Sequence, residues 1–168
     1  ARIEETGNYL FRQVASIWHL NEIEDLQWLS WATQLHELGL SIAHSHHHRH
    51  GAYIVEHADL SGFSQQEKAV LAMLIRAHRR KFPKTGFADL GESWQLRAQY
   101  LAIILRLSTL LHRSRATKAL PQIEVKATKS TLLLRFPDDW LDKHLLTKAD
   151  LELEASYLKD ADFSLEFA

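Results

Sequence analysis

The chain contains no cysteine among its 168 residues. The absence of thiols excludes disulfides, thiolate zinc sites, iron–sulfur clusters and cysteine nucleophiles together. Only 6 glycines and 3 prolines occur, and 46% of the residues are hydrophobic, so collagen-like, linker-like and disordered compositions are excluded. No apolar run reaches the roughly 18 uncharged residues that a membrane span needs, and the N-terminus does not resemble a signal peptide. We expect one globular unit with a cytoplasmic location. Because Ala1 stands where an initiator methionine would be, we also expect the chain to be part of a longer protein.

Charge is unevenly distributed, although the net charge is only −1. Residues 51–121 carry 11 basic and 5 acidic side chains, a net of +6, whereas residues 138–168 carry 3 basic and 9 acidic side chains, a net of −6. A basic middle between acidic ends favours a local anion site over a surface coated for bulk nucleic-acid binding. Basic helix faces that are simply solvated remain the competing interpretation.

Apolar spacing predicts helices through the first 120 residues, at 2–18, 24–38, 48–58, 64–78 and 93–112. Gly39 is expected to end the second helix, and Ser64 with Glu67 forms a capping box that begins the fourth. The last of these helices is apolar on nearly every side, so we expect it to be buried among the others. Residues 80–92, which contain Pro83, Gly86 and Gly91, are predicted to form a loop.

After Pro121 the hydrophobic period changes to alternation. Strands are predicted at 123–127, 132–136 and 163–167, with a helix that Thr147 caps and that runs to about Lys159. The fold class is therefore mainly α: a helical bundle over residues 1–120, with a small α+β lobe over residues 121–168. A lobe of this size holds too small a core to be stable alone, so it is expected to pack on the helices.

Histidine is unusually frequent, with 11 residues, five of them between His44 and His50. His36, Glu37, His50 and His78 fall at expected helix ends, where imidazole and carboxylate groups facing one cavity are suited to a divalent metal. The His36-Glu37 dipeptide alone is a weak signal, because the zinc-protease pattern needs a second His one turn later and Leu40 stands there. Polar residues that merely hydrogen-bond one another at helix ends are the alternative.

The order of these segments resembles a degenerate HD-type phosphohydrolase domain. In particular, residues 31–40, 44–54, 59–63, 76–80 and 132–141 resemble the C-terminal region of the exopolyphosphatase/guanosine pentaphosphatase family, and the resemblance extends from about Leu10 to Phe167. The 44–53 segment and the basic run after His78 favour the exopolyphosphatase branch.

This resemblance implies an HD-like helical bundle and an accessory role. In such proteins hydrolysis takes place in N-terminal actin-like domains that bind Mg²⁺ and polyphosphate, and nothing in this sequence resembles those domains. The resemblance therefore implies inorganic polyphosphate, the actin-like domains and a second copy in a homodimer as partners, with Mg²⁺ serving the parent enzyme. The resemblance does not imply a cofactor for this fragment itself.

Catalysis by the fragment itself is not expected, and we assign it no catalytic residue. Active HD domains hold metal with a His, a His-Asp pair and a later Asp. Here the pair is His36-Glu37, the later position falls on Thr109, and only His19 is available as the first ligand. A missing carboxylate removes charge that holds the ions in a two-metal site.

Basic side chains gather after the helix that ends at His78, as a polyanion would require. The candidate polyphosphate-binding residues are Arg76, Arg79, Arg80, Lys81, Lys84, Arg113, Arg115, His48 and Arg49. The leading hypothesis is thus a non-catalytic, polyphosphate-binding and dimerising domain of an exopolyphosphatase. The alternative is a divergent, active, metal-dependent HD phosphohydrolase acting on guanosine polyphosphates or other nucleotides. A nucleic-acid-binding module is disfavoured by the net charge and the lack of a recognition-helix pattern.

Overall fold

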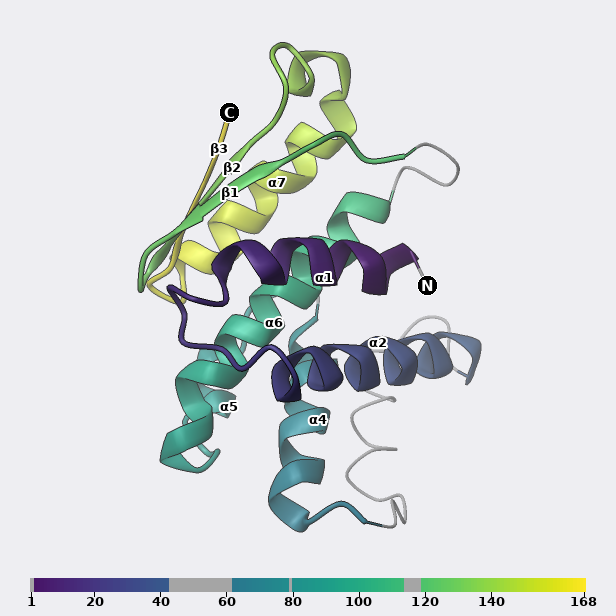
Figure 1. Cartoon of the computed structure of the whole chain (residues 1–168), viewed down its shortest axis with the longest axis vertical. Helices are drawn as coiled ribbons and strands as arrows, with labels where there is room; N and C mark the ends of the chain where they lie inside the picture. The colour runs from purple at the N-terminus through teal and green to yellow at the C-terminus, as the bar shows by residue number, and fades with distance from the viewer. Residues whose placement is uncertain (1, 43–61, 79, 114–118) are drawn as a thin grey trace.

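A computed structural model describes residues 2–42, 62–78, 80–113 and 119–168 of the chain (Figure 1). Helices dominate these residues, and three short strands form one sheet near the C-terminal end. The fold class predicted from the sequence, mainly helical with a small α+β lobe, is confirmed. The elements are α1 (Arg2–Val14), α2 (Glu24–Ile42), α4 (Gln65–Ala77), α5 (Lys84–Phe87), α6 (Glu92–His112), β1 (Glu124–Ala127), β2 (Thr131–Arg135), the 3-10 helix η1 (Leu141–Lys143), α7 (Leu145–Lys159) and β3 (Ser164–Phe167).

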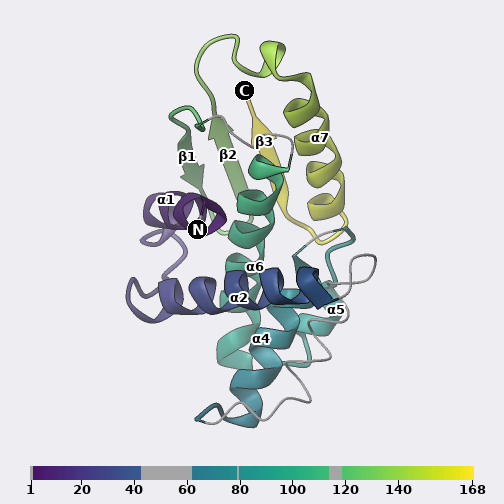
Figure 2. The same ribbon diagram turned by 90° about the vertical axis from the view of Figure 1, so that its right-hand side faces the viewer.

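Helix α6 is the centre of the molecule, as its all-round apolar sequence predicts. It contacts α1, α2, α4, α5 and α7, and twelve of its residues are buried. Figures 1 and 2 show it running from α4 and α5 at one end of the molecule to the sheet and α7 at the other. Helix α1 crosses it closely at Gly7, where an added Cβ would lie 3.2 Å from Ser108 Oγ. The candidate residue Arg113 directly follows this central helix.

The ends of α4 are fixed by the residues that the sequence indicated. Ser64 accepts a hydrogen bond from the Glu67 amide, and the Glu67 carboxylate accepts one from the Ser64 amide, so the capping box is present. The helix runs to Ala77 with His78 as the C-terminal cap. This places the basic run directly after a well-defined helix end.

The lobe is a β-hairpin followed by a helical crossover. Strands β1 and β2 pair antiparallel, and β2 pairs parallel with β3, which gives the order β1-β2-β3. Helix α7 makes the connection between the two parallel strands, as such pairing requires. One buried apolar cluster contains residues from both the helical part and the lobe, including Leu101, Leu111, Leu134, Leu151 and Phe163.

Polar bonds also join the hairpin to α1 and α6. The Tyr9 hydroxyl donates to the Ile123 carbonyl at 3.1 Å, and the Trp18 indole N–H donates to the Thr128 carbonyl at 2.8 Å. The Tyr100 hydroxyl donates to the Lys129 carbonyl at 2.6 Å, and burial raises the pKa of this phenol. The lobe is thus seated on the first and the central helix.

Four local expectations were wrong. Helix α1 ends at Val14 and not at residue 18, and residues 15–19 form a turn. Helix α2 continues through Gly39 to Ile42, because one glycine inside a helix costs only about 1 kcal/mol. Thr147 does not cap α7; it is buried inside that helix, which begins at Leu145 after His144. The 80–92 segment contains the short helix α5. The helix expected at 48–58 lies outside the described residues, and the boundary at residues 120 and 121 stays a prediction. Within the described ranges, no helix is both long and apolar enough to cross a membrane.

Candidate functional site

Four candidate phosphate-binding cations lie on or just after the last turn of α4. Arg76, Arg80, Lys81 and Lys84 are all exposed. Arg80 has a φ of 65°, so the backbone turns through the left-handed region there. The chain therefore changes direction at Arg80, and the residues that follow do not continue along the axis of α4.

Two cations that are 33 positions apart in the sequence meet at one pocket. Arg80, from the turn after α4, and Arg113, at the end of α6, both line a pocket of about 220 Å³. The opposite wall comes from α7, with Asp150, Glu154 and Tyr157. The structure therefore brings the basic turn, which carries Arg80 and Lys81, together with the end of the core helix.

Carboxylates of the lobe already pair with two of these cations. Lys84 Nζ lies 2.7 Å from Asp162 Oδ2, and Arg113 Nη1 lies 3.8 Å from Asp150 Oδ1. The hydrogen bond from Lys84 and its positive charge hold the pKa of Asp162 below its ordinary value. Arg80 and Lys81 pair with no carboxylate among the residues that the structure describes. The basic middle and the acidic end of the sequence thus neutralise each other in part, and Arg80 and Lys81 keep their charge exposed.

Several candidates lie outside the described residues. They are His48, Arg49, His50, Arg79 and Arg115. Their assignment to polyphosphate binding, or in the case of His50 to a metal, stays a prediction.

His36 and His78 come together in the helical part. Their rings lie 4.0 Å apart between centroids, at 62°, and both side chains are buried. The His78 Nδ1–H donates to the Ile75 carbonyl. The Glu37 side chain, in contrast, is exposed.

The described residues contain no group of three or more His, Cys, Asp or Glu side chains placed to hold a metal ion. A catalytic zinc site uses three protein ligands, so the two buried imidazoles fall short of one by themselves. Thr109, which the resemblance places where active HD domains have an aspartate, donates its hydroxyl to the Leu105 carbonyl of its own helix at 2.9 Å. His19 is exposed in the turn after α1.

A buried ion pair that was not predicted from the sequence borders the pocket. The Arg106 Nε and Nη2 atoms donate to the two carboxylate oxygens of Glu154, at 2.6 and 3.0 Å, and both side chains are buried. Two signals for it are present in the sequence. Arg106 interrupts an otherwise apolar helix, and Glu154 shares the helical spacing of Leu151 and Leu158, which are buried. A charge in such a position needs a partner.

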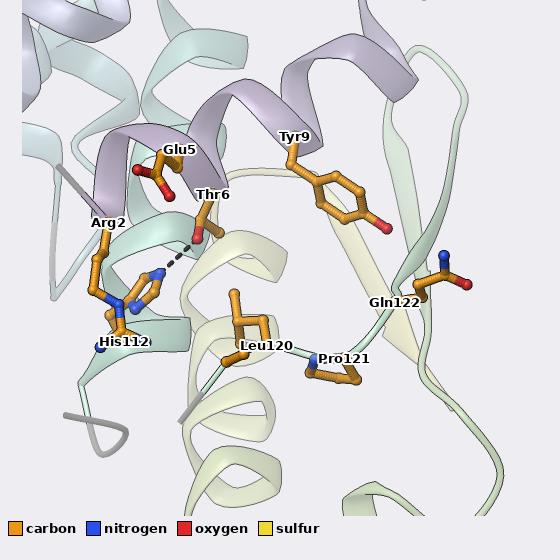
Figure 3. Close-up of a pocket in the computed structure, with 9 residues that line it drawn as sticks. Arg2, Glu5, Thr6, Tyr9, His112, Leu120, Pro121 and Gln122 are labelled. Carbon is orange, nitrogen blue, oxygen red and sulfur yellow. Dashed lines mark hydrogen bonds between the residues drawn. The ribbon is translucent and has the colours of Figure 1, made fainter. Parts of the chain in front are cut away.

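A second, larger pocket of about 370 Å³ lies between α1, the end of α6 and residues 119–122 (Figure 3). Thr6 Oγ1 and His112 Nε2 are joined by a 2.5 Å hydrogen bond at its wall. Arg2 and Glu5 of α1 also line it, as do Leu120 and Pro121. None of these residues is among the candidate site residues predicted from the sequence. Because His112 lines this pocket and Arg113 the other, the end of α6 contributes to both.

Comparison with known proteins matches residues 1–155 to domain III of the Ppx/GppA phosphatases. A guanosine-5'-triphosphate,3'-diphosphate pyrophosphatase of Pseudoalteromonas translucida (strain TAC 125) is 34% identical over 146 residues, which are 87% of this chain and 29% of that protein. Proteins of the same name from Aeromonas salmonicida and Aeromonas hydrophila are each 31% identical over 153 residues, which are 91% of this chain and 31% of theirs.

The chain therefore spans about three tenths of the length of these relatives. All three carry the guanosine nucleotide name, so they do not support the preference for the exopolyphosphatase branch. The match over most of the chain shows the family, but not which branch of it the chain belongs to. This chain belongs to the Ppx/GppA phosphatase family, in which it corresponds to domain III.

Proposed function

We propose that this chain is an accessory, non-catalytic domain of a Ppx/GppA phosphatase, which binds inorganic polyphosphate and supports a homodimer. Phosphoanhydride hydrolysis would take place, with Mg²⁺, in actin-like domains of the same protein. The observation that carries the proposal is the convergence of Arg80 and Arg113 on one pocket beside the exposed Lys81. Arginine suits this task because it stays charged at any working pH and presents paired N–H donors to phosphate oxygens.

A guanosine polyphosphate is the second candidate ligand, because the relatives above are named for such a nucleotide. Both candidates present phosphate oxygens to the same cations. They differ in chain length and in the nucleoside, so a comparison of the two ligands separates them. Affinity for polyphosphate should rise with chain length as more phosphates are neutralised, whereas a nucleotide offers only a fixed number of phosphates.

The first prediction is that polyphosphate binding by the purified chain depends steeply on salt and on the basic turn. Replacing Arg80 by Gly and Lys81 by Ala removes two cations, and Gly accepts the positive φ at position 80. The slope of log affinity against log salt concentration is then expected to become shallower by roughly 1.4, since each phosphate contact contributes roughly 0.7 in a single-stranded polyanion. Isothermal titration calorimetry with long and short polyphosphate and with guanosine pentaphosphate, at several salt concentrations, measures this.

A matched control replaces Lys129 and Lys143 by Ala, which removes two exposed lysines from the β1–β2 turn and η1. This variant should keep the parent slope. If the Arg80 and Lys81 variant binds long polyphosphate as tightly as the parent at low salt, the basic turn is only a solvated face. If the parent prefers the nucleotide to long chains, the second ligand replaces the first.

The second prediction concerns catalysis. The purified chain should release no phosphate from polyphosphate or guanosine pentaphosphate with Mg²⁺ or Mn²⁺, because Thr109 bonds to its own helix and supplies no carboxylate. A malachite-green assay for free phosphate measures this. Metal-dependent turnover that His36→Ala abolishes would instead establish the active phosphohydrolase alternative.

A further inference from the structure

The guanidinium of Arg106 contacts three segments at once. Besides the two bonds to Glu154 of α7, Nη1 donates to the Ala77 carbonyl at 2.7 Å, and Nη2 also donates to the Arg80 carbonyl. Phe82 and Tyr157 flank the group, with ring centroids 5.5 and 5.6 Å from its central carbon. Arg106 is 1% exposed, so it is not itself available to a ligand.

These bonds fix the backbone from which the basic side chains project. The Ala77 carbonyl belongs to the last turn of α4, whose carbonyls have no partner within the helix, and a cationic donor there is favoured by the helix dipole. The Arg80 carbonyl belongs to the residue with positive φ, a conformation that a non-glycine residue keeps only when its surroundings hold it. Arg106 therefore holds both ends of the turn that follows α4.

We propose that Arg106 and Glu154 are positioning residues for phosphate binding: they hold the backbone at Ala77 and at Arg80 so that Arg80 faces the pocket it shares with Arg113. This inference rests on the proposed function. It adds that a buried ion pair, whose arginine is not available to a ligand, sets the affinity, because a binding surface that is already ordered loses less entropy when the ligand binds.

The pair also links the lobe to the phosphate site. Glu154 lies in α7, whereas the turn that it helps to hold follows α4. Docking of the lobe and phosphate binding therefore stabilise each other, since a coupling between two binding equilibria is reciprocal. The acidic lobe then has a role beyond neutralising charge: through Glu154 it keeps Arg106 in the position in which both carbonyls are bonded.

The test uses two substitutions in the full chain that keep every charge. Arg106→Lys lacks the planar fork that reaches a carboxylate and two carbonyls together, and Glu154→Asp shortens the carboxylate side chain by one methylene. Two readouts are taken where circular dichroism shows each variant folded: the Kd for long polyphosphate at low salt, and amide hydrogen exchange across residues 77–82. For both variants we expect roughly tenfold weaker binding, equivalent to about 1.4 kcal/mol, and faster exchange confined to this segment.

Arg97→Lys is the matched control, because Arg97 lies on the same helix and pairs with the buried carboxylate of Asp25 at 2.6 Å. It disturbs a similar ion pair away from the turn and should leave the Kd within twofold of the parent. If Arg106→Lys and Glu154→Asp bind like the parent, or if Arg97→Lys weakens binding equally, the positioning role is rejected. A parent chain that binds no polyphosphate means instead that the proposed function has failed.

Discussion

A peptide of residues 122–168 is expected to be unfolded in isolation. Its buried residues, among them Leu134, Leu151 and Phe163, share one apolar cluster with the helical part, and two of its hairpin carbonyls are bonded by Trp18 and Tyr100. Without those partners a lobe of this size buries too little surface to offset the entropy of ordering its chain. Far-ultraviolet circular dichroism of the peptide should resemble that of a random coil.

The complementary fragment, residues 1–121, should also be less stable than the parent chain. Cutting after Pro121 removes Glu154, the carboxylate partner of Arg106, and exposes the apolar side chains of the helical part that pack against the lobe. A domain is stable by only roughly 5–15 kcal/mol, so these losses are a large fraction of its stability. Residues 1–121 should therefore unfold at markedly lower temperature than the parent chain. A cooperative thermal transition in the 122–168 peptide would contradict the dependence of the lobe on the helices.

Trp18→Ala is expected to be among the most destabilising single substitutions. The indole is 3% exposed, stacks on Tyr100 at 4.2 Å and 3°, meets the edge of Phe163 at 5.9 Å and donates to the Thr128 carbonyl. Truncation leaves a cavity at the junction of α1, α6 and the lobe, and we expect a loss of about 3–5 kcal/mol in the free energy of unfolding. Equilibrium unfolding in urea measures it.

The neighbouring residue provides the control. Ile17 is 54% exposed, so Ile17→Ala should change the free energy of unfolding by less than about 0.5 kcal/mol. Trp18→Phe retains a ring at the stack but leaves the Thr128 carbonyl without the indole donor, and should fall between the two. Equal losses for Ile17→Ala and Trp18→Ala would show that the junction is not held by the indole.

Local signals in the sequence predicted the fold class and most of the elements. The capping box of Ser64 and Glu67 marked the start of α4, and the apolar surface of α6 identified the central helix, because both depend on residues near each other in the chain. The prediction that Thr147 caps α7 was wrong, since the Thr-x-x-Asp pattern also occurs inside a helix whose buried face includes the threonine. A capping pattern alone does not distinguish these two positions.

The candidate site was only partly predictable. A run of cations is visible in the sequence, so Arg80 and Lys81 could be named, but the pairing of Lys84 with Asp162 joins residues 78 positions apart and appears only in three dimensions. The same holds for Arg106 and Glu154, which are 48 positions apart. Each is a charged residue at a position of its helix where the neighbouring residues are apolar. Only packing of α7 against α6 shows that the two irregularities compensate each other.

The bond from Trp18 to Thr128 also bears on the order in which the chain folds. It joins residues 110 positions apart, as does the contact of Gln13 with Ile123. Individual helices and the β1–β2 hairpin form within microseconds from contacts between near neighbours, whereas closing so long a loop carries an entropic cost before any contact is gained. The helices should therefore appear early, and the seating of the lobe on α1 should be a late step. Until then Trp18 and the apolar side of the hairpin stay exposed, so the slow step of folding is also the period in which this chain is most prone to aggregate.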